Sequence, residues 1–303
     1  MITEVPPTPP TPAAPPPPAA PPASPTPTTI DALLERYDGL LLDAYGVLVD
    51  ARGLLPGAAA LLAELHRRAM PFAIVTNDAS RSLATWSARF AGHGAAVEPE
   101  HIVTAGSLLP GYFRDRGLAG ARTCVLGTAD SVGYVREGGG VPIPLAPGME
   151  LDVLAVCDDS GTPFVEGIER AFSAVVRAVH AGRAPALVLP NPDLIYPKGD
   201  GEYGYTAGAM ALVIEAALAR RFPAHQLRFE HLGKPEPRLF AEARHRLGVA
   251  NLVMIGDQLE IDIAGARAAG IDAALLGGVS HWDARAVPPS GIAPTYLLAT
   301  IEA

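Results

Sequence analysis

The sequence predicts an α/β fold in which a doubly wound parallel sheet carries a second, inserted α/β domain. Short apolar runs of four to seven residues, bounded by turn residues, alternate along the chain with amphipathic segments. Because these runs are apolar at odd and even positions alike, they are typical of strands covered on both faces, as in a parallel sheet. Strands that alternate with helices favour a doubly wound arrangement.

The proline-rich N-terminal segment, residues 1–28, stands apart from this alternation. It holds 13 of the chain's 31 prolines. Because it offers little apolar area to bury and few free N–H groups, it is typical of a solvated, polyproline-II-like chain. We expect a disordered tail that acts as a spacer, with a PxxP ligand as the alternative. The folded body is then expected to begin near Ile30.

The predicted core comprises residues 29–118 and 226–303. Its expected strands are the apolar runs Gly39–Leu42, Pro71–Val75, Asn251–Ile255 and Ile271–Leu276. Its expected helices are the amphipathic segments Gly57–Ala69, Arg81–Gly92, Glu236–Leu247 and Ile261–Ala269. Each strand is followed by a helical pattern, which is the repeating unit of a doubly wound sheet.

The middle of the chain, residues 119–225, has a βα alternation of its own. Its expected strands are Thr123–Leu126, Val153–Cys157 and Ala186–Leu189, and its expected helices lie near Val165–His180 and Thr206–Arg220. We therefore expect a small α/β domain inserted into the first one.

Composition and motif searches exclude several classes of protein. The net charge is −9 and no run of Lys or Arg occurs, which argues against nucleic-acid binding. No apolar stretch approaches the length of a membrane span, and the N-terminus lacks the pattern of a secretory signal, so we expect a cytoplasmic protein. The two cysteines cannot build a disulfide framework or a four-ligand zinc site.

Motifs of other enzyme classes do not occur. The eight histidines show neither HxxxH nor HExxH spacing, and we interpret them as structural or surface residues. A GxSxG elbow and a P-loop are also missing, so the sequence gives no support for a serine hydrolase or a Walker-type NTPase.

Polar residues follow the predicted core strands at the points where these end. Asp43 follows the first strand, Thr76 and Asn77 the second, and Asp257 a later one. The loop before that later strand carries a lysine, and the helix after it begins with a further carboxylate; these are Lys234 and Asp262. Ligands of open α/β sheets bind outside the carboxyl ends of the strands, so we expect these groups to converge there.

This set of groups suits phosphoryl chemistry. Carboxylates together with water oxygens make a site for Mg²⁺. A carboxylate that attacks phosphorus needs its charge offset by a metal ion and a lysine, and a hydroxyl and an amide can donate to the remaining phosphoryl oxygens.

The motifs, in their order, resemble those of the haloacid dehalogenase (HAD) superfamily. A large insertion between the second and third motifs resembles subclass IIA, the NagD-like and pyridoxal phosphate/phosphoglycolate phosphatase group. The resemblance covers about residues 36–303 and includes VTND, NPD, GKPEP, GDQLEIDIAGARAAG, GVS and PTY. It implies a parallel-sheet core with an inserted α/β cap domain, and a phosphatase-like hydrolase that acts on a small phosphorylated metabolite.

The resemblance also implies residue roles. Asp43 would be the nucleophile and Lys234 a catalytic and phosphate-binding residue, with Thr76 and Asn77 on the phosphate. Mg²⁺ would be held by Asp43, the main-chain carbonyl of Tyr45 and Asp257, with Asp262 behind them. In the cap, Asn191 and Asp193 would contact the substrate. Because relatives in this branch often dimerise through the cap, the resemblance also implies a homodimer.

Simpler interpretations exist for the same residues. Asp43, Asn191 and Asp193 could be turn formers, and Lys234 a solvated loop charge. Thr76 could be a helix N-cap, and Asp262 could favour the first turn of a helix through the macrodipole. We prefer the functional reading for all of them except Asn191 and Asp193.

Tyr45 departs from the family pattern. The family's phosphatases carry there a second aspartate that protonates the leaving oxygen and later activates water, and such help is worth about 10²–10⁴ in rate. Reduced phosphatase activity is therefore expected, with a phosphoryl-ligand-binding or regulatory protein as the alternative. Asp-Ala-Tyr also looks like the first motif of L-2-haloacid dehalogenases, so carbon chemistry is a minor alternative.

Overall fold

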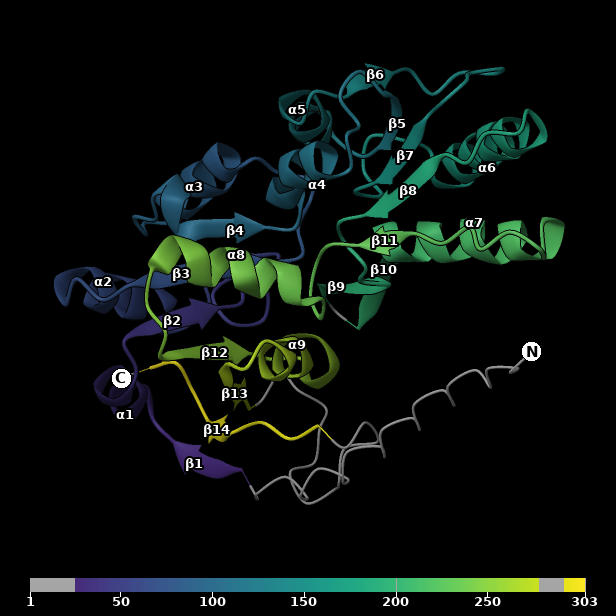
Figure 1. Cartoon of the computed structure of the whole chain (residues 1–303). Coiled ribbons are helices and arrows are strands. Elements are labelled where there is room, and N and C mark those ends of the chain that lie inside the picture. Colours follow the sequence, from purple (N-terminus) through teal and green to yellow (C-terminus); the bar gives the residue numbers. More distant parts are fainter. Residues whose placement is uncertain (1–24, 200, 278–291, 303) are drawn as a thin grey trace, which may run out of the picture.

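A seven-stranded parallel sheet forms the core, in the order β1-β14-β13-β12-β2-β3-β4, within the residues that the computed structural model describes (25–199, 201–277 and 292–302). Figure 1 shows this sheet with helices on both sides. The strands are β1 (Thr26–Thr28), β14 (Tyr296–Leu298), β13 (Asp272–Leu276), β12 (Leu252–Gly256), β2 (Gly39–Leu42), β3 (Phe72–Thr76) and β4 (Ile102–Thr104).

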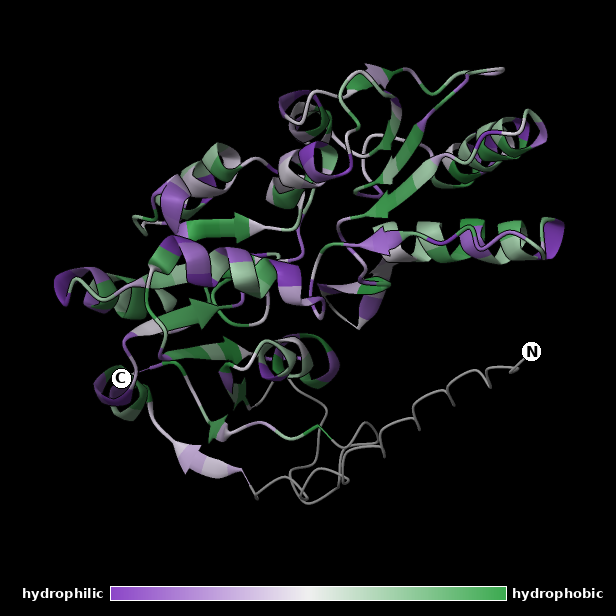
Figure 2. Cartoon of the chain, viewed as in Figure 1, coloured by the Kyte–Doolittle hydropathy of each residue, from purple (hydrophilic) through white to green (hydrophobic). Residues whose placement is uncertain are grey.

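Helices cover both faces of this sheet, which confirms the predicted doubly wound fold. Leu40 and Leu42 of β2 pack into one apolar cluster with the first group of helices, α1 (Ile30–Arg36), α2 (Ala58–Arg67) and α3 (Leu83–Gly92). Leu41, between them, packs into a second cluster with α8 (Pro237–Leu247) and α9 (Ala264–Ala268). A strand whose side chains point alternately into two apolar clusters must be apolar at every position. Figure 2 shows β4, β8 and β12 coloured hydrophobic along most of their length.

The inserted domain is a second parallel sheet, in the order β11-β8-β7-β5-β6. Its strands are β5 (Arg122–Leu126), β6 (Val141–Ile143), β7 (Val153–Val156), β8 (Ala186–Leu189) and β11 (Glu230–His231). Helices α6 (Phe164–His180) and α7 (Ala207–Arg221) pack on one face, and α4 (Leu109–Asp115) and α5 (Ala129–Glu137) on the other. An antiparallel hairpin, β9 (Ile195–Gly199) and β10 (Glu202–Tyr205), precedes α7.

Two boundaries of the sequence analysis are wrong. Residues 26–28, expected in the tail, form β1, an edge strand beside β14, where Pro27 is tolerated because an edge strand need not donate on its outer side. Residues 230 and 231, expected in the core, form β11 and pair with Val188 and Leu189 of the inserted sheet. Both strands are too short to produce a recognisable hydrophobic period.

Two features predicted from the sequence fall outside the described residues. These are residues 1–24 of the proline-rich segment and the GVS motif at Gly278–Ser280. Among the described helices, none combines the length and hydrophobicity that crossing a bilayer requires.

The strand directions position the site. In Figure 1, β2, β4 and β12 point toward the side of the core on which the inserted domain lies. The carboxyl ends of β2, β3 and β12 therefore face the cap, and the polar residues that follow them are brought together there.

Candidate active site

Lys234 lies at the centre of the predicted cluster. Its Nζ donates to Asp43 Oδ1 at 2.7 Å, to Asp262 Oδ1 at 2.6 Å and to the backbone oxygen of Val75 at 3.1 Å. The side chain is only 2% exposed. Burial opposes its charge, but the carboxylates of Asp262 and Asp43 outweigh burial and raise the pKa of Lys234 above its usual range. All three ammonium hydrogens are engaged, so Lys234 orients Asp43 and supplies positive charge rather than a further donor.

Asp257 brings an unpartnered oxygen into the same space. Ligand oxygens of Asp43, Asp257 and Asp262 lie within 4.8 Å of one another, and Oδ1 of Asp257 is buried with no hydrogen-bond partner among the described residues. A Cβ at Gly46, whose φ is +88°, would lie 2.3 Å from the Asp257 carboxylate, so only glycine lets the turn after Asp43 approach it.

Burial and mutual repulsion disfavour the charges of these carboxylates. Burial, Asp262 and Asp257 raise the pKa of Asp43 well above its usual value, against the opposing effect of Lys234. Burial and the Asp262 charge likewise raise the pKa of Asp257 to about 7. A divalent cation would relieve both costs, and its oxygen ligands are of the type that Mg²⁺ prefers. The donor set therefore fits the predicted metal.

Asp262 fixes its neighbours, and both of its oxygens accept hydrogen bonds from protein groups. Oδ1 accepts from Lys234, and Oδ2 accepts from the backbone N–H groups of Asp257 at 3.2 Å and Gln258 at 3.1 Å. The single turn of π-helix that contains it, Leu259–Ile263, carries the carboxylate back to the end of β12. Asp262 therefore holds Lys234 and the start of the loop after β12 in place.

Asn77 differs from its expected role. Its Oδ1 accepts from the Lys234 backbone N–H at 2.6 Å, and its Nδ2 donates to the Lys234 carbonyl at 3.1 Å and to Asp193 at 2.9 Å. Both amide hydrogens are used, so the side chain positions the lysine loop instead of donating to a phosphate. A Cβ at Gly233 would lie 2.6 Å from Asn77 Oδ1, which explains the glycine before the lysine.

Thr76 remains available at the site. Its side chain is buried at the end of β3, where Oγ1 accepts from the Asp78 backbone N–H at 3.3 Å. The hydroxyl keeps its own proton to donate. The alternative role as a helix N-cap is wrong, because Ser82 caps α3.

The NPD loop of the cap contacts the core directly. Asn191 Oδ1 accepts from the Asp193 backbone N–H at 3.1 Å and so closes a turn, while the Asp193 carboxylate accepts from Asn77. The Asp193 carbonyl also accepts from the Thr206 hydroxyl, next to the start of α7. Asn191 thus closes the turn, and Asp193 joins this loop of the cap to the end of β3.

Tyr45 lies at the rim of the cluster. The side chain is 37% exposed, and its hydroxyl accepts from Arg89 Nη1 at 2.9 Å. Its ring packs edge-on against Trp86 with centroids 5.7 Å apart, and the Arg89 guanidinium lies over the ring. The phenol is thus held in place, with its own O–H still free to donate.

The groups that hold Tyr45 and Trp86 in place are not evident from the sequence. Asp78 Oδ2 accepts from Trp86 Nε1 at 2.6 Å and from Arg81 Nη1 at 3.1 Å. Asp78 directly follows Asn77, one of the predicted site residues, and this position is only a weak indication that Asp78 belongs to the site. Arg81 and Arg89 are polar positions at or near an amphipathic helix, and nothing in a single sequence separates them from ordinary surface residues.

Comparisons with known proteins agree with this arrangement. A family model described as haloacid dehalogenase-like hydrolase matches residues 40–140, and one described as HAD-hydrolase-like matches residues 231–303. The D-glycerol 3-phosphate phosphatase of Mycobacterium tuberculosis is 28% identical over 271 residues, which are 88% of this chain and 70% of that protein.

Solved structures show the same fold. A possible sugar phosphatase of the HAD superfamily from Cytophaga hutchinsonii superposes with a TM-score of 0.80 at 26% identity, over 92% of this chain and 99% of that one. A glycerol phosphate phosphatase from Mycobacterium tuberculosis, solved with magnesium, gives a TM-score of 0.74 at 25% identity, over 89% and 76%.

Proposed function

The chain belongs to the haloacid dehalogenase superfamily of hydrolases, with the cap inserted as in subclass IIA, and we propose that it is a Mg²⁺-dependent phosphatase of small phosphorylated metabolites. One observation carries the proposal: a buried carboxylate, Asp43, is held by Lys234 beside a second carboxylate, Asp257, with an unpartnered buried oxygen. A nucleophile, a positive charge and a divalent-cation site thus coincide at the strand ends.

The nucleophile is Asp43. Its hydrogen bonds to described residues, from Lys234 and from the Ala44 backbone N–H at 2.7 Å, both go to Oδ1. Oδ2 is therefore the oxygen that attacks phosphorus: a bond forms from Oδ2 to phosphorus while the bond to the leaving oxygen breaks, and water then hydrolyses the aspartyl-phosphate. Thr76 donates to a phosphoryl oxygen, and the backbone N–H of Asn77 replaces its engaged side chain in that role.

Asp43, Asp257 and the main-chain carbonyl of Tyr45 would hold the Mg²⁺. When bound, the ion offsets the charge of the two carboxylates and of the phosphoryl group. Lys234 contributes the fixed positive charge of the site and holds Asp43 in line, while Asp262 fixes both Lys234 and Asp257.

The site lacks the carboxylate that the family's phosphatases use for acid–base catalysis. Tyr45 stands where the family's phosphatases carry an aspartate, and its hydroxyl can donate a proton to the leaving oxygen. A neutral phenol is a poor base toward water. Hydrolysis of the aspartyl-phosphate is thus expected to be slow, and esters with good leaving groups, such as aryl phosphates, are expected to suffer least in the first step.

The relatives guide the choice of substrate. Two of the relatives are described as a D-glycerol 3-phosphate phosphatase and a possible sugar phosphatase. We therefore favour a phosphomonoester of a small polyol or sugar, selected by the cap.

A substrate panel tests the proposal. Phosphate release from p-nitrophenyl phosphate, glycerol 3-phosphate and sugar phosphates would be measured with Mg²⁺ and with EDTA, and Asp43→Asn protein prepared in parallel would detect contaminating phosphatases. Metal-dependent release supports the proposal. Phosphate binding without turnover would favour the binding-protein alternative, and metal-free halide release from a 2-haloacid would favour carbon chemistry.

Homodimerisation through the cap is a further part of the proposal. The cap exposes apolar side chains on α6, on α7 and in the β9–β10 hairpin, namely Val165, Leu194, Ile195, Tyr203, Tyr205, Leu212 and Val213. Such surface is typical of an interface. Light scattering of the intact chain would give the mass of a dimer, and a monomer at all concentrations would contradict it.

A further inference from the structure

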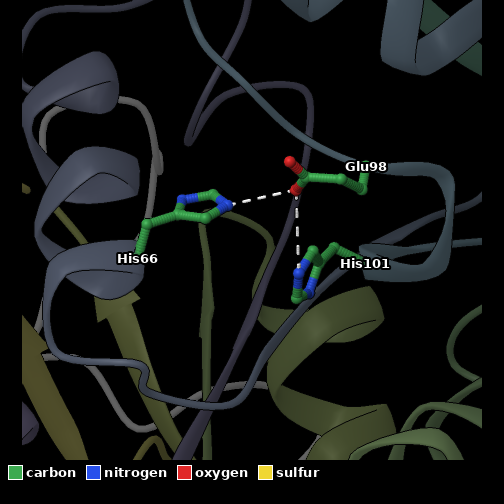
Figure 3. A group of neighbouring side chains, drawn as sticks. All are labelled: His66, Glu98 and His101. Carbon is green, nitrogen blue, oxygen red and sulfur yellow. Dashed lines mark hydrogen bonds and ion pairs between the residues drawn. The ribbon is translucent and has the colours of Figure 1, made fainter.

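A second cluster of metal-ligating side chains lies away from the catalytic carboxylates. Figure 3 shows His66, Glu98 and His101 turned toward one another. His66 Nε2 is 3.1 Å and His101 Nε2 is 3.8 Å from the same oxygen, Glu98 Oε2. His66 lies on α2, Glu98 directly precedes the short 3-10 helix Pro99–His101 before β4, and His101 is the last residue of that helix.

Backbone carbonyls fix the orientation of both imidazoles. His66 Nδ1 lies 2.8 Å from the Leu62 carbonyl, and His101 Nδ1 lies 3.1 Å from the Phe72 carbonyl. A carbonyl can only accept, so each Nδ1 is the protonated nitrogen and each neutral ring presents an Nε2 lone pair. The Phe72 ring stacks on His101 with centroids 4.2 Å apart and holds it further.

Two nitrogen lone pairs and a carboxylate oxygen therefore converge without a hydrogen atom between them. Such groups repel unless a cation lies among them. A proton on His66 is one answer, since its bonds to the Leu62 carbonyl and to Glu98 raise its pKa. A proton on His66 joins that ring to Glu98 but leaves His101 Nε2 aimed at the same oxygen, whereas a metal ion would satisfy all three.

We propose that His66, Glu98 and His101 form a binding site for a divalent transition-metal ion of the Zn²⁺ class. Two imidazoles and one carboxylate suit Zn²⁺ and its neighbours better than Mg²⁺, which prefers oxygen ligands. Tetrahedral Zn²⁺ with bonds of about 2.0–2.1 Å separates its ligands by roughly 3.3 Å, between the two observed distances. The side chains are 29–48% exposed, so water can complete the coordination.

The position of this site indicates a structural role. Phe72 begins β3 and His101 directly precedes β4, so the cluster lies at the amino edge of the sheet. The catalytic carboxylates lie at the opposite, carboxyl edge. A bound ion would join α2 to the segment before β4 and would stabilise the core without touching the reaction.

Zinc titration of the full chain tests the proposal. Calorimetry would be run with excess Mg²⁺, to occupy the catalytic carboxylates, on the wild type and on His66→Gln, His101→Gln and the control His245→Gln, an exposed histidine of α8. We expect one Zn²⁺ to bind the wild type and the control equally. Either site variant should weaken binding at least about tenfold, since even the loss of an outer partner costs about 10–100-fold. Equal affinity in all four proteins, or no Zn²⁺ uptake by the wild type, would overturn the proposal.

A second readout separates loss of the site from loss of the fold. The His66–Glu98 pair is exposed and worth little without metal, so the variants and the wild type should melt at similar temperatures in EDTA. Zn²⁺ should raise the melting temperatures of the wild type and of the His245→Gln control, but not those of the His66→Gln and His101→Gln variants. Co²⁺ bound to the wild type should show the intense visible bands of four-coordination. If the wild type instead shows the weak bands of six-coordinate Co²⁺, and the variants bind Co²⁺ with unchanged affinity, the ion binds at a site other than His66, Glu98 and His101.

Discussion

Asn77 of the core and Asp193 of the cap are joined by a hydrogen bond of 2.9 Å. The same side-chain amide accepts from the backbone N–H of Lys234 and donates to its carbonyl oxygen. The cap loop, the end of β3 and Lys234 are thus one connected unit. The position of the cap is coupled in this way to the lysine that holds Asp43.

This coupling predicts different effects for two substitutions of Asp193. Asp193→Asn keeps an oxygen that accepts from Asn77 and should leave stability and KM nearly unchanged. Asp193→Ala removes the acceptor and should cost about 1 kcal/mol of unfolding free energy, with a lower kcat. Urea denaturation and steady-state kinetics check this. A large rise in KM for Asp193→Asn would instead indicate direct substrate contact.

Replacing the buried lysine should be among the most damaging changes. Lys234→Met leaves the carboxylates of Asp43 and Asp262 buried without their cation, and breaking such a pair costs about 3–5 kcal/mol. Urea denaturation in EDTA measures it, with the exposed Lys198→Met as the matched control. A Lys234→Met protein as stable as the control would mean that these carboxylates are already neutral.

Stability without metal should fall as pH rises through the titration of Asp257. The folded pKa of about 7 exceeds the ordinary value of 3.8, so the folded state binds the proton more tightly. The stabilisation is complete below about pH 4 and is lost as pH rises toward 7. Mg²⁺, which needs the ionised carboxylate, should therefore raise the melting temperature strongly at pH 8 and little at pH 5.

An amide at this position separates the two effects. Asp257→Asn should melt higher than the wild type at pH 8 in EDTA and should lose the response to Mg²⁺, whereas the exposed Asp115→Asn should behave as wild type. A wild-type melting temperature that does not change between pH 5 and pH 8 in EDTA would contradict the assignment.

Tyr45→Asp should raise phosphatase turnover. If the chain lacks only its acid–base group, the new carboxylate supplies part of the roughly 10²–10⁴ that this function contributes. Tyr45→Phe is the control, because it keeps the ring on Trp86 and removes only the hydroxyl that Arg89 binds. A folded, Mg²⁺-binding Tyr45→Asp protein without turnover would show that more than this group is missing.

Elements with a strong period could be predicted from the sequence, and the shortest ones could not. The expected strand Gly39–Leu42 coincides with β2, and the expected helix Val165–His180 with α6, because each carries a full hydrophobic pattern. β1 and β11 have three and two residues, and tertiary pairing alone makes them strands.

The candidate site shows the same division. The convergence of Asp43, Lys234 and Asp257 follows from residue type at strand ends. The role of Asn77 depends on which of its neighbours reaches it in three dimensions, and the convergence of His66 with His101 joins a helix to a loop more than thirty residues away. Neither leaves a local spacing that a single sequence could reveal.

The central claim is that Asp43 is the nucleophile of a phosphatase, and the most direct measurement is phosphate release by Asp43→Asn beside Asp115→Asn. The amide keeps the size of the side chain but cannot form the aspartyl-phosphate at a useful rate. We expect a folded Asp43→Asn protein with no Mg²⁺-dependent turnover and an Asp115→Asn control with wild-type kinetics. Turnover retained in cleanly purified Asp43→Asn protein would contradict it.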